Sequence, residues 1–225
     1  MQRRGRAVGV KLGGRGNLLD GGDDGRTWAG FPDGPRNTPA LFGAAQTLPL
    51  HWNGNLDELQ DVEITIRNIM GGAGLIDGQP NPPLGPPNAG RSAALDELAA
   101  YLTTLKPQPS PYAPSTDAEA AAVQRGVYAF QRWGCSVCHA GPHFTDQQLH
   151  LSGIGDPALE RNQPGPLPRF DTPSLQGVWA TAPYFHDGSA ASLRDVLFSK
   201  DFHDMGPAMD AGEPEDLIAY LKSLP

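Results

Sequence analysis

The sequence predicts a mostly α-helical protein made of two similar halves with long loops, and three observations support this. A stretch of 25 residues recurs 134 positions later in the chain, and each half closes with a similar amphipathic helix. Glycine (28) and proline (23) are abundant among the 225 residues, which indicates extended loops between the helices. The glycines follow no fixed period, which argues against a collagen-like or low-complexity chain.

The repeat aligns residues 38–62 with residues 172–196 without a gap. Ten positions are identical in the two copies: Thr38 and Thr172, Pro39 and Pro173, Leu41 and Leu175, Gly43 and Gly177, Thr47 and Thr181, Pro49 and Pro183, Gly54 and Gly188, Leu59 and Leu193, Asp61 and Asp195, Val62 and Val196. Such self-similarity at one fixed offset indicates a tandem duplication.

The closing helices, over residues 95–107 and 215–225, carry apolar residues three and four positions apart. The proline-rich stretch that follows the first of them reads as a stiff linker. We therefore expect an N-terminal domain over residues 1–106, a linker over 107–116 and a C-terminal domain over 117–225.

Two helices are predicted in the rest of the first half. Asn55 is expected to cap a helix over residues 56–70, although the alternating Val62–Ile66 stretch leaves a strand open. Ser92 is expected to cap the helix that closes this half. The glycine- and proline-rich residues 74–90 between them are predicted to form a loop.

Three helices are predicted in the second half. Thr116 and Glu119 have the spacing of a capping box, which opens a helix that ends at Gly134. Ser192 is expected to cap a short helix, and Pro214 suits the first turn of the last one.

Charge and hydropathy exclude two classes of function. The longest apolar runs are only five residues, so no segment is long enough to span a bilayer. The 17 basic and 25 acidic residues give a net charge of -8, and basic residues cluster only near the N-terminus, which argues against nucleic-acid binding. Small basic proteins are the partners that this charge favours.

The only two cysteines form the sequence Cys135-Ser136-Val137-Cys138-His139. This C-x-x-C-H spacing is typical of covalent haem c attachment, in which two thiols bond the vinyl groups and the next histidine ligates the iron. Zinc held by these three residues and His143 is an alternative, but the adjacent Cys138 and His139 fit a closed tetrahedron poorly. A thioredoxin-like pair is a second alternative, although the strand–helix alternation of that fold is missing.

Haem c is attached outside the cytoplasm in bacteria, so a periplasmic or extracellular location is expected. The start of the chain is basic and lacks the apolar core of a signal peptide. No cysteine stands where the repeat would place a first haem motif. We expect that motif, and export information, to lie upstream of this sequence.

The residues resemble a family, the bacterial di-haem cytochrome c peroxidases and the related haem enzymes that mature methylamine dehydrogenase. The resemblance rests on CSVCHAGPHFTDQQLH (135–150), on DTPSLQGVWATAPYFHDGSAASLRDVL (171–197), and on RNTPALFG and LPLHWNGNLDELQD in the first half. It implies two cytochrome c-like domains that each hold one haem, the first reacting with peroxide and the second transferring electrons. The C-terminal domain here resembles the second.

The resemblance also implies a sixth iron ligand about fourteen residues after His186, where this chain has Lys200. Nearby alternatives are His203, Met205 and Met209, and we expect Met205, with His203 second, because a Met ligand raises the haem potential. A five-coordinate iron is the remaining alternative. His186 itself is expected at the interface of the two domains.

Two further sites follow from the resemblance. The carbonyls of Thr181 and Pro183 match ligands of an interdomain calcium, although the first-half asparagine that completes the site is not evident from the sequence. Gln60 and Glu63 are the candidates for catalytic residues beside a first haem, with a solvated helix face as the alternative.

Three functions remain open at this stage. The first is a peroxidase-like oxidoreductase that takes electrons from a small redox protein, such as a cytochrome c or cupredoxin, and reduces hydrogen peroxide or performs a related oxidation. The second is a mono-haem electron carrier without peroxidase activity. The third is a binding module whose haem is only structural.

Overall fold

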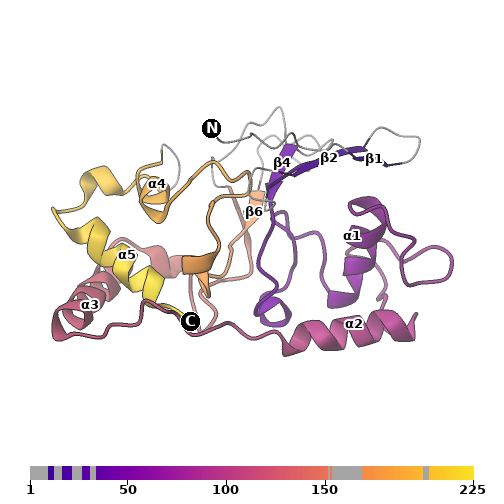
Figure 1. The fold of residues 1–225 in the computed structure, drawn as a ribbon, viewed down its shortest axis with the longest axis horizontal. Coiled ribbons are helices and arrows are strands. Elements are labelled where there is room, and N and C mark those ends of the chain that lie inside the picture. Colours follow the sequence, from indigo (N-terminus) through magenta and orange to yellow (C-terminus); the bar gives the residue numbers. More distant parts are fainter. Residues whose placement is uncertain are drawn as a thin grey trace, which may run out of the picture.

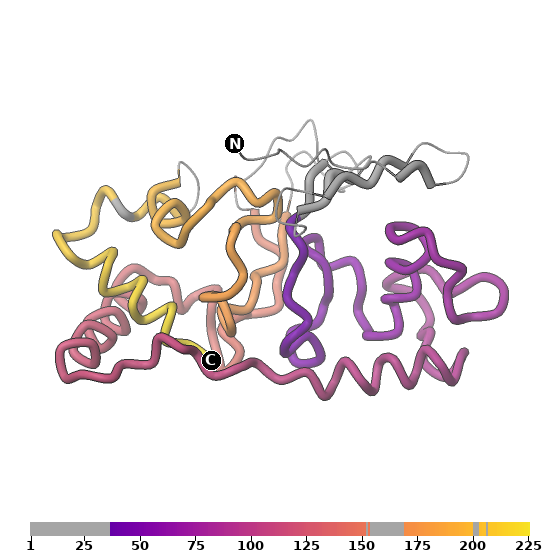
Figure 2. The backbone as a smooth tube through the Cα atoms, in the orientation of Figure 1, coloured from indigo at the N-terminus to yellow at the C-terminus, as the bar shows by residue number. Residues whose placement is uncertain are grey.

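The structure is a computed structural model that describes residues 37–151, 153, 169–199 and 203–225, together with the backbone of four strands between residues 10 and 37. Figure 1 shows two helical lobes side by side. One lobe contains α1 (Val62–Asn68) and α2 (Ala93–Thr104), and the other contains α3 (Asp117–Arg132), α4 (Leu193–Leu197) and α5 (Glu213–Ser223). An extended segment after α2 runs along both lobes (Figure 2). In the described parts of the chain, no helix has the length and apolarity needed to cross a membrane.

The strands are short. An antiparallel sheet contains β1 (Val10–Leu12), β2 (Asn17–Gly21), β3 (Thr27–Gly30) and β4 (Gly34–Asn37), in sequence order. A second sheet pairs β5 (Leu149–Leu151) with β6 (Arg169–Asp171), antiparallel, with Leu149 opposite Asp171. The predicted mostly helical class therefore holds, but the sheet before residue 37 was not predicted.

The first helix differs from the prediction. Asn55 does not cap it: its Oδ1 lies 2.9 Å from Nδ1 of His51, and a 3₁₀ turn over Leu59–Asp61 precedes α1. The helix covers only Val62–Asn68, so the strand alternative for this stretch is wrong as well. Valine, isoleucine and threonine lose χ1 freedom in a helix, which fits its shortness.

The capping predictions for the other helices are confirmed. Ser92 accepts the N–H of Leu95 at the start of α2, and Thr116 and Glu119 form both bonds of the capping box at α3. Ser192 caps α4, and proline lies in the first turn of α5. Because a cap satisfies backbone N–H groups within one turn, short sequence patterns are enough to predict it.

The main apolar core lies where α3 packs against α5. It contains the buried side chains Ala129, Phe130, Val178, Leu193, Leu197, Leu217, Leu221 and Leu224. Gly126 permits this packing, because a Cβ atom there would lie 2.1 Å from the backbone oxygen of Asp216. Arg125 adds a two-bond ion pair to the Asp216 carboxylate, at 2.6 and 2.7 Å.

The repeat recurs in the backbone of residues 37–56 and 171–190. Each copy contains a 3₁₀ turn, Ala44–Gln46 or Val178–Ala180, and a cis peptide bond before Pro49 or Pro183. Further matched features are the positive φ angles of His51 and Phe185, both 66°, and the bridges Leu50–Leu56 and Tyr184–Ala190. The two segments therefore have the same local structure.

The two copies also contact each other. The backbone N–H of Asn37 donates to the carbonyl of His186 at 2.6 Å, and that of Asp171 donates to the carbonyl of Trp52 at 2.7 Å. The side-chain amide of Gln147 donates to the carbonyls of Gln46 and Leu48 at 3.2 and 2.8 Å. The lobes are thus joined by backbone and side-chain hydrogen bonds.

Candidate haem site

A cavity of about 500 Å³ lies between the two copies of the repeat and the α3–α5 core. Both cysteines of the C-x-x-C-H motif and its histidine line the wall, and most of the other lining side chains are apolar. First-half residues, including Trp52 and Pro49, close the side opposite the core. A cavity of this size and polarity suits an organic cofactor.

The cysteine turn follows directly from the end of α3. Gly134 has a φ of 73°, a left-handed conformation that glycine adopts without strain, and it turns the chain into the 3₁₀ segment Cys135–Val137. Both thiols are free and half-buried. Burial raises the pKa of Cys135 to about 11, and burial followed by the nearby Asp146 carboxylate raises the pKa of Cys138.

The structure disfavours the two alternatives from the sequence. Cys135, Cys138, His139 and His143 do not form a metal-ligand cluster among the residues that the structure describes. A thioredoxin-like pair depends on a thiolate whose pKa is lowered by cationic neighbours or a helix N-terminus. The described surroundings of the two thiols raise their pKa instead. Cys138, Asp146 and His150 do approach within 4.8 Å of one another, but thioether bonding of Cys138 would remove it as a metal ligand.

His139 is oriented for iron ligation. Its Nδ1 lies 3.1 Å from the carbonyl of Phe144, so this nitrogen carries the proton and Nε2 keeps a lone pair. Burial lowers the pKa of the ring to about 4, so the imidazole is neutral near pH 7. A neutral imidazole with one nitrogen fixed by a backbone carbonyl is the form that binds a metal.

The candidates for the sixth ligand also reach the cavity. Met205 and His203 both line it, whereas Met209 packs against the apolar core. Lys200 lies outside the described residues. His203 is in ring contact with Phe185, with centroids 5.8 Å apart. The structure thus places two of the three alternatives at the wall, and the choice of Met205 stays a prediction.

His186 lies at the contact between the two repeat copies, as expected. It is 2% exposed, stacks on Phe170 with centroids 4.0 Å apart, and meets Trp52 edge to face at 6.4 Å. The indole of Trp52 donates to the carbonyl of Asn37 at 2.7 Å. These rings form an aromatic group on the cavity wall, in which His186 and Phe170 are buried and Trp52 is half-buried.

The structure brings an asparagine of the first half, Asn37, next to Pro183, a contact that the sequence analysis did not foresee. Asn37 is buried, and its Nδ2 donates to the carbonyl of Pro183 at 2.5 Å, while its Oδ1 accepts no hydrogen bond within the described chain. The repeat could have pointed to Asn37, because this residue directly precedes the Thr-Pro pair with which the first copy begins. A buried, unsatisfied amide oxygen is a ligand that a hard cation such as calcium accepts, and a flip of the Asn37 amide would direct Oδ1 towards the Pro183 carbonyl.

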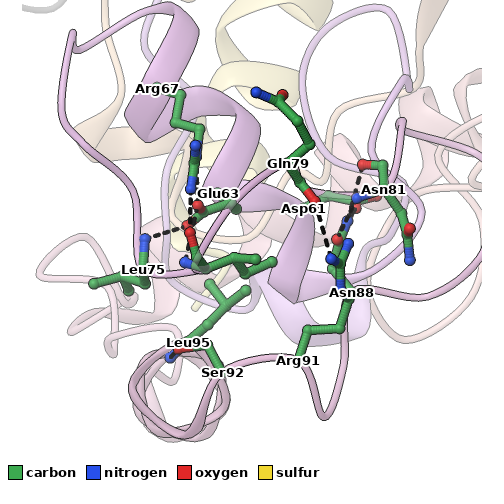
Figure 3. Close-up of polar contacts among 11 residues, drawn as sticks. Asp61, Glu63, Arg67, Leu75, Gln79, Asn81, Asn88, Arg91, Ser92 and Leu95 are labelled. Atoms are coloured by element: carbon green, nitrogen blue, oxygen red, sulfur yellow. Dashed lines mark hydrogen bonds and ion pairs between the residues drawn. The ribbon is translucent and has the colours of Figure 1, made fainter.

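Gln60 and Glu63 lie elsewhere, in the first lobe, and neither lines the cavity around Cys135. Glu63 is fully buried, so the solvated-face alternative is wrong for this residue. Figure 3 shows its carboxylate between Arg67, at 2.6 Å, and the backbone N–H of Leu75, at 2.7 Å. Burial alone would raise the pKa of Glu63, but these donors outweigh it and lower the pKa. The amide of Gln60 donates to Asp96 at 2.9 Å.

A second buried polar cluster in this lobe was not foreseen. Asn88 donates to Asp61 at 2.9 Å and accepts the N–H of Asn81 at 2.8 Å (Figure 3). Both Asn88 and Asp61 are buried. The cluster anchors the long loop after α1, and the proline- and glycine-rich sequence of that loop gave no sign of it.

Comparison with known proteins agrees with this site. Residues 170–204 match the family model described as "RoxA-like, cytochrome c-like". The chain is 29% identical to hydrazine synthase subunit gamma of Kuenenia stuttgartiensis, over 58% of this chain and 48% of that protein. It is 27% identical to the cytochrome c551 peroxidase of Pseudomonas aeruginosa, over 87% of this chain and 66% of the relative. The methylamine utilization protein MauG of Methylophilus methylotrophus is 25% identical to this chain, over 84% of this chain and 68% of that protein.

A solved structure of Kuenenia stuttgartiensis hydrazine synthase has the same fold, with a TM-score of 0.60 and 23% identity over 85% of this chain and 73% of the other. Fold, motif and cavity make the chain similar to cytochrome c-like proteins, and together they support a site for haem c. Within this class, the family match and the named relatives support the family of di-haem cytochrome c peroxidases and MauG, as the motifs predicted. The chain spans about half of the hydrazine synthase subunit and about two thirds of the peroxidase.

Proposed function

We propose that this chain carries the electron-transfer haem of a protein of the di-haem cytochrome c peroxidase type. Electrons from a small redox protein, such as a cytochrome c or cupredoxin, would pass through this haem towards peroxide reduction, or a related oxidation, at an N-terminal site. The single observation that carries the proposal is the C-x-x-C-H turn on the cavity wall with the imidazole of His139 oriented by the Phe144 carbonyl.

Each residue has a defined part in this proposal. Cys135 and Cys138 hold the haem through thioether bonds, and Nε2 of His139 is the proximal ligand. The haem itself supplies one-electron exchange when bound. Met205 is the proposed sixth ligand, with His203 as the alternative, because a thioether raises the potential and a second imidazole lowers it. The apolar lining excludes water from this centre.

We also place a calcium ion between the halves, held by Asn37 and the carbonyls of Thr181 and Pro183. The unsatisfied Oδ1 of Asn37 supports it. The proposal retains the domains 1–106 and 117–225, joined by 107–116. The family relatives and the chemistry of haem c attachment favour a periplasmic location.

The test is expression of the chain in a host with periplasmic cytochrome maturation, followed by a pyridine haemochrome assay. We expect one covalent haem per chain, a Soret band, and loss of covalent haem in a Cys135→Ala/Cys138→Ala variant. A Ser136→Ala variant within the same turn is the matched control and should keep its haem. A colourless wild-type product would overturn the proposal.

A mono-haem electron carrier is the second candidate, and one observation favours it. Both oxygens of the Glu63 carboxylate and the amide of Gln60 are already engaged within the protein, so they are poorly placed to move protons for peroxide cleavage. Under this alternative, the haem-loaded chain gives a low-spin spectrum and consumes no peroxide. A longer reading frame with a second C-x-x-C-H upstream, whose product turns over peroxide, would instead support the first candidate.

A further inference from the structure

The contact between the two repeat copies is locally two-fold symmetric. Asn37 and Asp171 occupy matched positions, as do Trp52 and His186. Asn37 donates its N–H to His186, and Asp171 donates its N–H to Trp52, at 2.6 and 2.7 Å. Each copy thus donates to the other copy the same backbone hydrogen bond that it accepts from it. This reciprocity is typical of a contact with two-fold symmetry.

This symmetry indicates what the side chain of Asp171 faces. The side-chain amide of Asn37 donates to the carbonyls of Pro183 and Phe185, at 2.5 and 3.4 Å. The matched carbonyls in the first copy belong to Pro49 and His51, whose backbone has the same conformation. From this symmetry we expect the Asp171 carboxylate to lie near those two carbonyls. Asp171, Pro49 and His51 all line the cavity.

The chemistry at the two positions differs. An asparagine amide donates hydrogen bonds to carbonyl oxygens, whereas a carboxylate only accepts them. Asp171 is 9% exposed, and its Oδ1 accepts no hydrogen bond from the part of the chain that the structure describes. The nearby Asp146 carboxylate adds to the negative potential there. A buried carboxylate facing carbonyl oxygens requires a positive partner or a proton.

We propose that Asp171, together with the carbonyls of Pro49 and His51, binds a divalent cation of the calcium type between the two halves. The oxygen-only ligand set is the one that hard cations select, and the carboxylate supplies the charge. This site is separate from the one at Asn37 and does not depend on it.

The test is calcium titration of the haem-loaded protein after treatment with EDTA, with bound calcium counted by elemental analysis and affinity measured by calorimetry. We expect the Asp171→Ala variant to bind one calcium fewer per chain than the wild type, and Asp171→Asn to bind at least tenfold more weakly at that site, because it loses the charge. The Asn37→Ala variant should retain the Asp171 site.

Two controls separate the outcomes. Asp146→Asn alters the neighbouring carboxylate and should leave the number of bound ions unchanged. Equal calcium binding by wild type and Asp171→Ala would overturn the proposal. So would loss of the ion in Asp146→Asn alone, or an infrared band of a protonated carboxyl that persists in saturating calcium and disappears in Asp171→Asn. Haem content, read from the haemochrome, reports on the proposed function independently.

Discussion

The two lobes share a repeated backbone but are stabilised in different ways. In the second lobe, eight buried apolar side chains form one cluster around α3 and α5, directly beneath the cavity. The described apolar core of the first lobe is smaller, with Leu59, Ala99 and Leu102 at its centre, and buried polar groups hold its long loop. Segments with the same local backbone are therefore compatible with two kinds of interior, and the apolar interior adjoins the site proposed for haem.

The largest expected effect is at the crossing of α3 and α5, which has no counterpart between the described helices of the first lobe. Gly126→Ala puts a Cβ atom 2.1 Å from the Asp216 carbonyl, so α3 and α5 must separate. We expect a loss of about 3 kcal/mol or more in the free energy of unfolding, measured by denaturant titration. Gln124→Ala on the exposed face of α3 is the control, with a change within about 0.5 kcal/mol. Equal stability of both variants would show that the crossing is not tightly packed.

The matched leucines of the closing helices sharpen the comparison. Leu102 and Leu221 both follow an Ala-Tyr pair and both are buried, but only Leu221 lines the cavity. Replacement of either by alanine should cost about 2 to 3 kcal/mol. Only Leu221→Ala should also shift the Soret band or the haem potential. A comparable spectral shift in Leu102→Ala would contradict the position of Leu102 away from the cavity.

Glu63→Gln tests the polar interior of the first lobe. The variant keeps the shape but removes the charge that binds Arg67 and two backbone N–H groups, and we expect a loss of about 2 kcal/mol at pH 7.

The folded-state pKa of Glu63 is lowered, so its contribution is complete above its ordinary value of 4.5 and is lost as the pH falls through the folded-state pKa. The difference between wild type and variant should therefore shrink in acid. Glu215→Gln, which alters an exposed pair with Arg194, should change stability by less than about 1 kcal/mol. A pH-independent difference would argue against an ionised Glu63.

The smallest effects are expected at the helix caps, one in each half. Ser92→Ala and Thr116→Ala each remove one hydrogen bond to a backbone N–H, and each should lower the free energy of unfolding by about 1 kcal/mol. Thr116 also forms a capping box with Glu119, so adding Glu119→Ala to the Thr116→Ala variant should lower the free energy of unfolding further. Thermal unfolding of the haem-loaded protein measures both, and a neutral Thr116→Ala would contradict the capping geometry.

The features that could be predicted from the sequence are those that depend on residues close together in the chain. Ser92, Thr116 and Ser192 act within one helical turn, so these caps could be predicted. The cysteine motif indicates its chemistry within five residues, and its role in binding haem stays a prediction. Asn55 failed as a cap because His51 binds its side chain, a competition that the pattern does not show.

Long-range features required the structure. Glu63 and Arg67 have the i, i+4 spacing of a common surface pair, and only the fold of the following loop buries the carboxylate. The contact of Asn37 with Pro183 joins residues far apart in the chain. The repeat could have indicated this contact, because matched positions in two segments related by two-fold symmetry each lie next to the other segment.

The position of Gln147 has a consequence for how the protein matures. Its side-chain amide donates hydrogen bonds to two carbonyls of the first half. Gln147 lies eight residues after His139, in the same loop. Anchoring the imidazole to iron would restrain that loop, and the restraint would be passed to the neighbouring lobe. Loading of the cofactor should therefore act as an assembly step, after which the two lobes are more resistant to proteolysis at their junction.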